Sequence, residues 1–183
     1  MIQNLKRQLA QHQKYRVDLP QFNPSAVLVP LYLKKGEEYL LFTVRNHLVR
    51  HHKGEICFPG GRADETDSSL ERTALRECEE ELGIAPHKIE ILGEMDDLIT
   101  PTFYKISPFV GLLEDIDKIQ MNHHEISEVL EIPLKHFLDS KSLEMAYFEY
   151  FGESLEFPFY YWNHHRIWGA TARILRQLTL MVR

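Results

Sequence analysis

The sequence predicts an α/β fold in which a mixed sheet lies between helices. Three observations predict it. The 183 residues match the size of one domain, 44% of them are hydrophobic and 26% charged, and strand-like runs alternate with stretches of helical periodicity. Strands interleaved with a few helices favour a mixed sheet covered on both faces. Neither an internal repeat nor a long flexible linker divides the chain, so we expect a single domain over residues 1–183.

The first third of the chain predicts a helix and then three strands. Within residues 1–20, apolar side chains recur three and four positions apart, which indicates a surface helix with a lead-in to the core. The runs Ala26–Leu33 and Tyr39–Val44 are apolar and strand-sized, and the Lys-Lys-Gly-Glu segment between them is typical of a turn. Glu55–Phe58 is a further short extended run, which ends at the Pro-Gly-Gly of residues 59–61.

The remaining elements follow from the same periodicities. Ser68–Leu82 is helical in pattern, and Gly83 stands where a left-handed C-terminal cap belongs. Strands are expected next at Lys88–Asp96 and Ile106–Leu113. The closing part predicts a short helix, two strands and a final helix, at Pro133–Leu138, Leu143–Tyr150, Glu156–Tyr161 and Trp168–Leu180.

Charge and composition exclude several classes of function. The chain has 27 acidic and 21 basic residues, a net charge of −6, so we expect no nucleic-acid partner. No run of about 18 apolar residues occurs, so no membrane span is expected. Two cysteines are too few for a disulfide framework or a thiolate zinc site, and they favour a reducing compartment, with the cytoplasm as the expected location.

The helical stretch carries three carboxylates on one stripe. Glu77, Glu80 and Glu81 are three and four positions apart, where like charges repel by about 0.2–0.5 kcal/mol per pair. Converging carboxylates make a hard, oxygen-rich site of the kind that Mg²⁺ or Mn²⁺ prefers. A glutamate-rich helix is more often a solvated surface. The preceding Pro-Gly-Gly turn, where backbone can approach a ligand closely, favours the metal site.

The segment from Gly61 to Ile84 resembles the Nudix box, G-x5-E-x7-R-E-U-x-E-E-x-G-U, in which U is apolar. The second half, Arg-Glu-Cys-Glu-Glu-Glu-Leu-Gly-Ile, matches at every specified position. The first half departs from the pattern, because Asp67 replaces glutamate and eight residues separate it from Arg76. We expect a loop one residue longer before the helix, with Asp67 as the helix cap. The resemblance implies a Nudix-type α/β/α sandwich.

The resemblance also implies a role for each matched residue. Glu77 and Glu81 would be the principal ligands of a Mg²⁺ or Mn²⁺ ion. Glu80 would be a further ligand, direct or through water, and the Gly60 carbonyl could complete the shell. Arg76 would orient the glutamates through its rigid fork of donors.

The residues before the box indicate which class of substrate to expect. Leu41–Gly61 resembles L-L-T-x-R-[SA]-x3-R-x3-G-x3-F-P-G-G, the signature of the coenzyme A pyrophosphatase branch, with Phe42 and Asn46 as departures. Its basic loop is a local island of positive charge that suits a polyanionic substrate. The substrate-binding residues that the resemblance implies are Arg45, Arg50 and Gly61.

The resemblance therefore implies a small-molecule substrate and metal-dependent attack of water on a pyrophosphate. Glu77 or Glu125 would act as the general base. Coenzyme A would yield 3′,5′-ADP and 4′-phosphopantetheine, or its acyl form. Two alternatives stay open: a pyrophosphatase for ADP-ribose, NADH or another nucleoside diphosphate, and a non-catalytic ligand-sensing module. Aromatic strand residues 157–162 leave room for a homodimer, and Phe109 and Trp168 are expected in the core.

Overall fold

The computed structural model describes residues 1–47, 53–114, 116, 119–150 and 153–182, and it contains every helix and strand that the sequence predicts. The helices are α1 (Ile2–Gln11), α2 (Leu70–Leu82), α3 (Leu134–Leu138) and α4 (Gly169–Val182), with 3-10 turns at Pro86–Lys88 and Ser140–Ser142. The predicted strands are β1 (Asn23–Lys34), β2 (Glu37–Arg45), β3 (Ile56–Cys57), β5 (Ile89–Glu94), β7 (Tyr104–Leu113), β9 (Leu143–Tyr150) and β10 (Glu153–Trp162). The strands that the sequence does not predict are β4 (Gly60–Arg62), β6 (Leu98–Ile99), β8 (Ile126–Pro133) and β11 (His165–Ile167).

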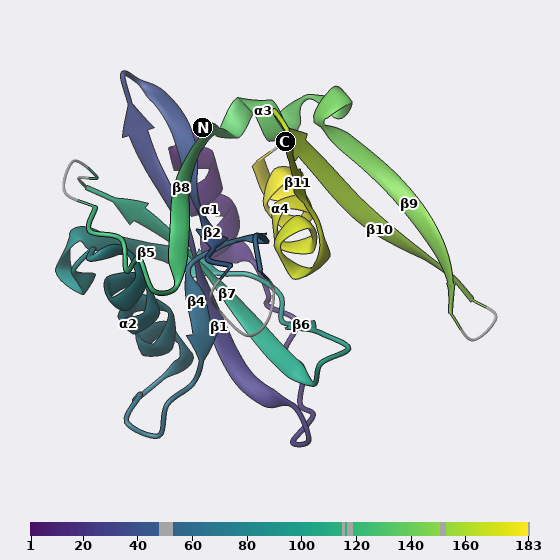
Figure 1. The fold of residues 1–183 in the computed structure, drawn as a ribbon, viewed down its shortest axis with the longest axis horizontal. Coiled ribbons are helices and arrows are strands. Elements are labelled where there is room, and N and C mark those ends of the chain that lie inside the picture. Colours follow the sequence, from purple (N-terminus) through teal and green to yellow (C-terminus); the bar gives the residue numbers. More distant parts are fainter. Residues whose placement is uncertain (48–52, 115, 117–118, 151–152, 183) are drawn as a thin grey trace.

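The strands form a mixed sheet and a smaller antiparallel one. The main sheet follows the order β3-β2-β1-β7-β5, while β4 pairs with β1, β6 with β7 and β8 with β2. The second sheet follows the order β11-β10-β9. Figure 1 shows α2 on one side of the main sheet and α1 and α4 on the other, which confirms the predicted mixed sheet between helices. No helix in the described part of the chain has the length and apolar character that a membrane crossing needs.

Strand β1 supplies both hydrophobic cores, because alternate side chains of a strand point to opposite faces. Ala26 and Leu28 pack in the cluster that contains the apolar side of α2. Val29 and Leu31 belong to the other cluster, with side chains from α1 and α4. Each large apolar side chain buried this way stabilises the fold by about 1.5–3 kcal/mol. This packing fixes α2 over the centre of the sheet.

The glycines of β4 let that strand approach β1 closely. Gly60 pairs with Val27 and Gly61 with Ala26. A Cβ atom built on Gly60 would lie 2.4 Å from the carbonyl oxygen of Ala26, so a side chain cannot be placed there without moving backbone. The pairing holds both glycines directly beside α2.

Two aromatic residues that the sequence analysis assigns to the core have different surroundings. Phe109 on β7 is buried, as predicted. Trp168 is 43% exposed, so its assignment to the core is wrong. The physical reason is its place in the link between β11 and α4, rather than on the packed face of either element.

Candidate active site

Helix α2 begins and ends on local capping interactions. The Ser69 side chain accepts a hydrogen bond from the backbone N–H of Arg72 at 3.2 Å, which makes Ser69 the N-cap. At the other end, Gly83 adopts the left-handed conformation (φ 69°) that its position predicts. The expectation that Asp67 caps the helix is wrong, because the helix begins two residues later than that role requires and the Asp67 carboxylate binds Arg76 instead.

The buried stripe of α2 determines where its glutamates point. Ala74, Cys78 and Leu82 pack against β1, which turns Glu77 and Glu81 toward β4. A Cβ atom on Gly61 would lie 2.5 Å from the Glu77 carboxylate, so that carboxylate occupies the space that a side chain at position 61 would need.

Glu81 is a buried carboxylate whose hydrogen-bonding capacity is only partly satisfied. It is 2% exposed, and among the described residues its Oε2 atom has no hydrogen-bond partner. Burial, followed by the negative charge of Glu77, raises the pKa of Glu81 to about 8. The positive charge of Arg45 and the backbone N–H of Gly60 act in the opposite direction. Burial also raises the pKa of Glu77.

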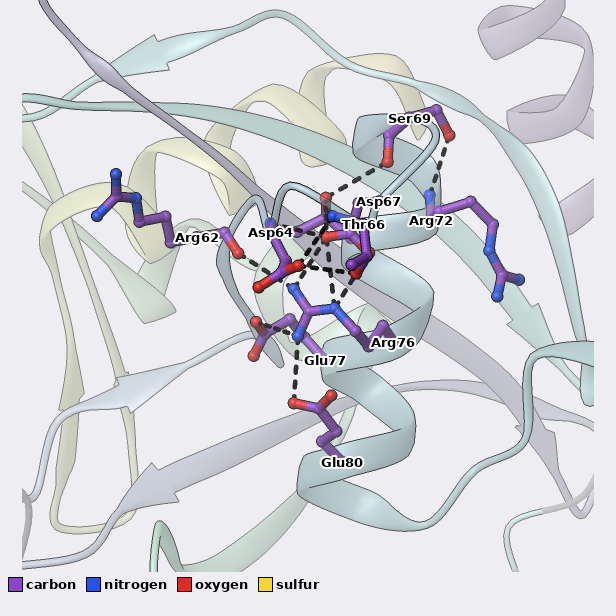
Figure 2. Close-up of polar contacts among 10 residues, drawn as sticks. Arg62, Asp64, Thr66, Asp67, Ser69, Arg72, Arg76, Glu77 and Glu80 are labelled. Carbon is purple, nitrogen blue, oxygen red and sulfur yellow. Dashed lines mark hydrogen bonds and ion pairs between the residues drawn. The ribbon is translucent and has the colours of Figure 1, made fainter.

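Arg76 joins the glutamates to the loop before the helix (Figure 2). Its Nη1 atom donates to Glu77 Oε1 at 2.8 Å and to Glu80 Oε2 at 3.2 Å. Its Nη2 atom donates to Asp67 Oδ2 at 3.0 Å and to the carbonyl oxygen of Arg62 at 3.1 Å. A guanidinium held at so many points has little freedom to rotate, so it fixes the direction of the Glu77 carboxylate.

Asp67 holds Arg76 in place, a role that the sequence analysis missed. Besides Arg76, its carboxylate accepts hydrogen bonds from the Thr73 hydroxyl at 2.9 Å and the backbone N–H of Asp64 at 3.0 Å. The hydrogen bond from Arg76 is the largest influence that lowers the pKa of Asp67 to about 2. A signal was present, because Asp67 takes the place of the first glutamate of the box and an acid is what Arg76 needs there.

Glu80 and Glu125 complete the acidic cluster at its solvent side. The Glu80 side chain is 57% exposed. The charge of Glu125 raises the pKa of both Glu77 and Glu81, which places its carboxylate near both. Backbone hydrogen bonds tie the segment before Glu125 to the end of α2, including one from the N–H of Asn122 to the Glu81 carbonyl at 2.9 Å.

The two departures from the coenzyme A signature have structural explanations. Phe42 is fully buried and stacks on Phe58 with ring centroids 4.7 Å apart, so the larger side chain fills the core below the glycine turn. The Asn46 side chain donates to the His123 carbonyl at 2.7 Å, and its backbone N–H donates to the Glu125 carbonyl at 2.7 Å. Asn46 therefore anchors the segment that carries Glu125.

Arg45 lies at the end of β2, beside Glu81 and Cys57. Burial raises the pKa of the Cys57 thiol to about 11, and the positive charge of Arg45 offsets part of this rise, as it does for Glu81. Its Nε atom is buried and has no hydrogen-bond partner among the residues that the structure describes. Backbone hydrogen bonds with Gly54 and Glu55 hold Arg45 at the base of the following loop. Arg50, the second arginine of the signature, lies outside the described residues.

The donor set suits a hard divalent cation. Within the described ranges, no three Asp, Glu, His or Cys side chains are already grouped as a metal would hold them. The unpartnered oxygen of Glu81 and the mutual repulsion of Glu77 and Glu81 are nevertheless what a cation would satisfy. The residues therefore fit the implied metal ion.

Comparison with known proteins identifies relatives of this chain. Residues 22–150 match the family model described as NUDIX domain. An uncharacterized Nudix hydrolase, NudL, of Photorhabdus laumondii is 37% identical over 158 residues, which span 86% of this chain and 84% of that protein. The peroxisomal coenzyme A diphosphatase NUDT7 of Mus musculus is 40% identical over 116 residues, or 63% of this chain and 49% of that protein.

A solved structure shows the same fold. The crystal structure of a NUDIX hydrolase from Alicyclobacillus acidocaldarius superposes with a TM-score of 0.58 and 17% sequence identity. The superposition covers 89% of this chain and 93% of that one. At this level of identity the likeness concerns the fold alone.

Proposed function

The chain belongs to the Nudix hydrolase family and is a pyrophosphohydrolase that acts on a small-molecule substrate, and from that premise we propose that it hydrolyses the pyrophosphate of coenzyme A and its derivatives. The products would be 3′,5′-ADP and 4′-phosphopantetheine, or its acyl form. The observation that carries the proposal is the position of Arg45 beside Glu81, which joins the coenzyme A signature to the carboxylates of the box. The name of the mouse relative, a coenzyme A diphosphatase, supports it.

Nudix hydrolases generally need divalent metal ions, and we propose Mg²⁺ or Mn²⁺ for this chain. Glu77 and Glu81 would hold the ion, with Glu80 and the Gly60 carbonyl as further ligands, and the bound ion would neutralise charge on the diphosphate. The guanidinium of Arg76 keeps Glu77 directed at this position.

The protein residues around the diphosphate would divide the remaining tasks. Arg45, and with it Arg50 and the backbone at Gly61, would bind phosphate oxygens and orient the substrate for in-line attack. A water oxygen attacks one phosphorus, the bond from that phosphorus to the bridging oxygen breaks, and the other phosphate leaves with the electron pair. Glu125, exposed and close to Glu77, is suited to accept the proton of the water, with Glu77 as the other candidate.

A panel of substrates tests this function. We expect purified protein with Mg²⁺ or Mn²⁺ to convert coenzyme A to 3′,5′-ADP, measured by chromatography, with kcat/KM at least tenfold higher than for ADP-ribose or NADH. Turnover of ADP-ribose or NADH without turnover of coenzyme A would support pyrophosphatase activity but contradict the proposal that Arg45 and Arg50 bind coenzyme A. Binding without turnover of any of them would indicate a ligand-sensing module, although the presence of all three box glutamates argues for catalysis.

We also propose that two copies associate through the β9–β10 hairpin, which projects from the body of the protein in Figure 1. Phe148, Leu155 and Phe157 lie on one face of the hairpin, and the rings of Phe148 and Phe157 are 5.6 Å apart. Light scattering is expected to give twice the 21.6 kDa of one chain, and Phe148→Glu is expected to give a monomer. A monomeric unmodified protein would contradict this.

For the location of the protein we propose the cytoplasm. Cys57 and Cys78 are free thiols, which supports this proposal.

A further inference from the structure

The turn between β6 and β7 presents an aromatic ring to solvent in an unusual backbone conformation. Phe103 has a φ of 61°, a left-handed conformation that bulky residues rarely adopt, and its side chain is 59% exposed. The ring lies 5.5 Å from that of Phe22, measured between centroids. Packing against one neighbour does not account for a strained residue that stays mostly exposed.

Hydrogen bonds on both sides hold this turn in place. The carbonyl oxygen of Phe103 accepts hydrogen bonds from the backbone N–H of Asn23 at 2.8 Å and from its side-chain amide at 3.2 Å. The backbone N–H of Thr100 donates to the Tyr104 carbonyl at 2.9 Å. The surrounding structure therefore maintains the strain, as it does where strained residues serve a ligand.

Arg173 of α4 reaches the same turn. Its Nη1 atom donates to the carbonyl oxygen of Ile99 at 3.0 Å. The side chain is half-buried, and burial lowers the pKa of its guanidinium. In the part of the chain that the structure describes, no carboxylate pairs with it, and most of its five N–H donors are unused. A half-buried cation without an acidic partner is suited to an anionic ligand.

The sheet register relates this turn to the glutamates of α2. Ile99 pairs with Lys105, and Lys105 pairs with Pro24, two residues before Ala26, which pairs with Gly61. Three inter-strand steps of about 4.8 Å and two residues of about 3.3 Å put Gly61 on the order of 15 Å from Ile99. The Arg173 guanidinium lies at the Ile99 end of this separation, and a nucleoside attached to the diphosphate would extend toward it.

We infer that the β6–β7 turn, with Phe22 and Arg173, is the subsite for the 3′-phosphoadenosine half of the substrate. This inference rests on the proposed function for its ligand. The exposed ring of Phe103, supported by its contact with Phe22, stacks on the purine base, as aromatic side chains do in other nucleotide sites. The free donors of the Arg173 guanidinium bind the 3′-phosphate, because the planar fork of the guanidinium can donate to two phosphate oxygens at once. The subsite thus distinguishes coenzyme A from nucleoside diphosphates that lack this phosphate.

Calorimetric titration with two free nucleotides tests the subsite separately from catalysis. The unmodified protein is expected to bind 3′,5′-ADP at least tenfold more tightly than 5′-AMP. Arg173→Gln is expected to remove most of that ratio, and Arg176→Gln, one turn further along α4, is expected to retain it. If the glutamine variant fails to fold, Arg173→Lys replaces it with the same expected loss, because a single ammonium lacks the fork.

Phe103→Gly separates binding from stability. Glycine adopts a φ of 61° without strain, so the melting temperature is expected to stay within a few degrees, whereas the affinity for both nucleotides is expected to fall about tenfold. Equal affinities of the unmodified protein for the two nucleotides, a retained ratio in Arg173→Gln, or unchanged binding by Phe103→Gly would each overturn the inference. None of these results depends on whether coenzyme A is hydrolysed, so a failure of the proposed function is seen separately in the substrate panel.

Discussion

Replacing Glu81 with glutamine is expected to lower diphosphate hydrolysis about a thousandfold and, in the absence of metal, to raise the melting temperature. The loss follows from removing a proposed ligand of the ion that neutralises the diphosphate, which supplies several kcal/mol to the transition state. The gain follows from the burial of Glu81, whose ionised form the folded protein disfavours. Steady-state kinetics and thermal unfolding measure the two effects on the same preparation.

The rise in melting temperature expected for Glu81→Gln depends on pH in a definite direction. The pKa of Glu81 is raised from its ordinary 4.5 to about 8 in the folded state, so the folded state binds the proton more tightly than the unfolded state does. Ionisation of Glu81 therefore costs stability as pH rises from about 4.5 to about 8, and glutamine avoids this cost. The difference in melting temperature between Glu81→Gln and the unmodified protein is expected to be near zero at pH 4 and largest above pH 8.

Two controls make the interpretation specific. Glu79→Gln removes one charge from an exposed position of the same helix, so it is expected to leave both activity and melting temperature nearly unchanged. Mn²⁺ is expected to raise the melting temperature of the unmodified protein and of Glu79→Gln, and to raise that of Glu81→Gln much less. A Glu81→Gln protein that keeps activity within tenfold would remove Glu81 from the metal site.

The helix of the site could be predicted because local rules determine it. Apolar spacing and Gly83 predict the end of α2 and the register of its glutamates, although the helix begins at Leu70 rather than at the predicted Ser68. Sequence spacing alone does not separate Glu80 from Glu81, since both lie on the same stripe. The rotation of α2 against β1, set by Cys78 and its neighbours, buries Glu81 and leaves Glu80 at the surface. The difference in burial between Glu80 and Glu81 therefore depends on tertiary packing.

The elements that the sequence analysis missed depend on long-range pairing. Strand β4 is three residues long and contains two glycines, so it lacks any intrinsic preference for a strand, and pairing with β1 alone makes it one. The role of Asn46 was also hidden, since its partner His123 is 77 residues away in the sequence and is brought close only by folding. The same holds for Arg173, whose contact with Ile99 spans 74 residues.

Gly61 lies directly beside the Glu77 carboxylate. Gly61→Ala is therefore expected to lower diphosphate hydrolysis at least a hundredfold with little change in stability. A Cβ atom there would lie 2.5 Å from the Glu77 carboxylate, which is the far end of a flexible side chain and can move aside. Moving aside breaks the 2.8 Å hydrogen bond from Arg76 and withdraws a proposed metal ligand, and such misplacement of a catalytic group is costly.

Gly60→Ala provides the contrast that identifies the cause. There the added Cβ atom would meet the carbonyl oxygen of Ala26 at 2.4 Å, and a backbone atom held in a sheet cannot move aside. Gly60→Ala is therefore expected to lower the melting temperature by several degrees as well as activity, whereas Gly61→Ala is expected to melt within about two degrees of the unmodified protein. Equal destabilisation by the two substitutions would show that Gly61 is needed for the fold rather than for Glu77. Full activity in Gly61→Ala would show that Glu77 does not need its observed position.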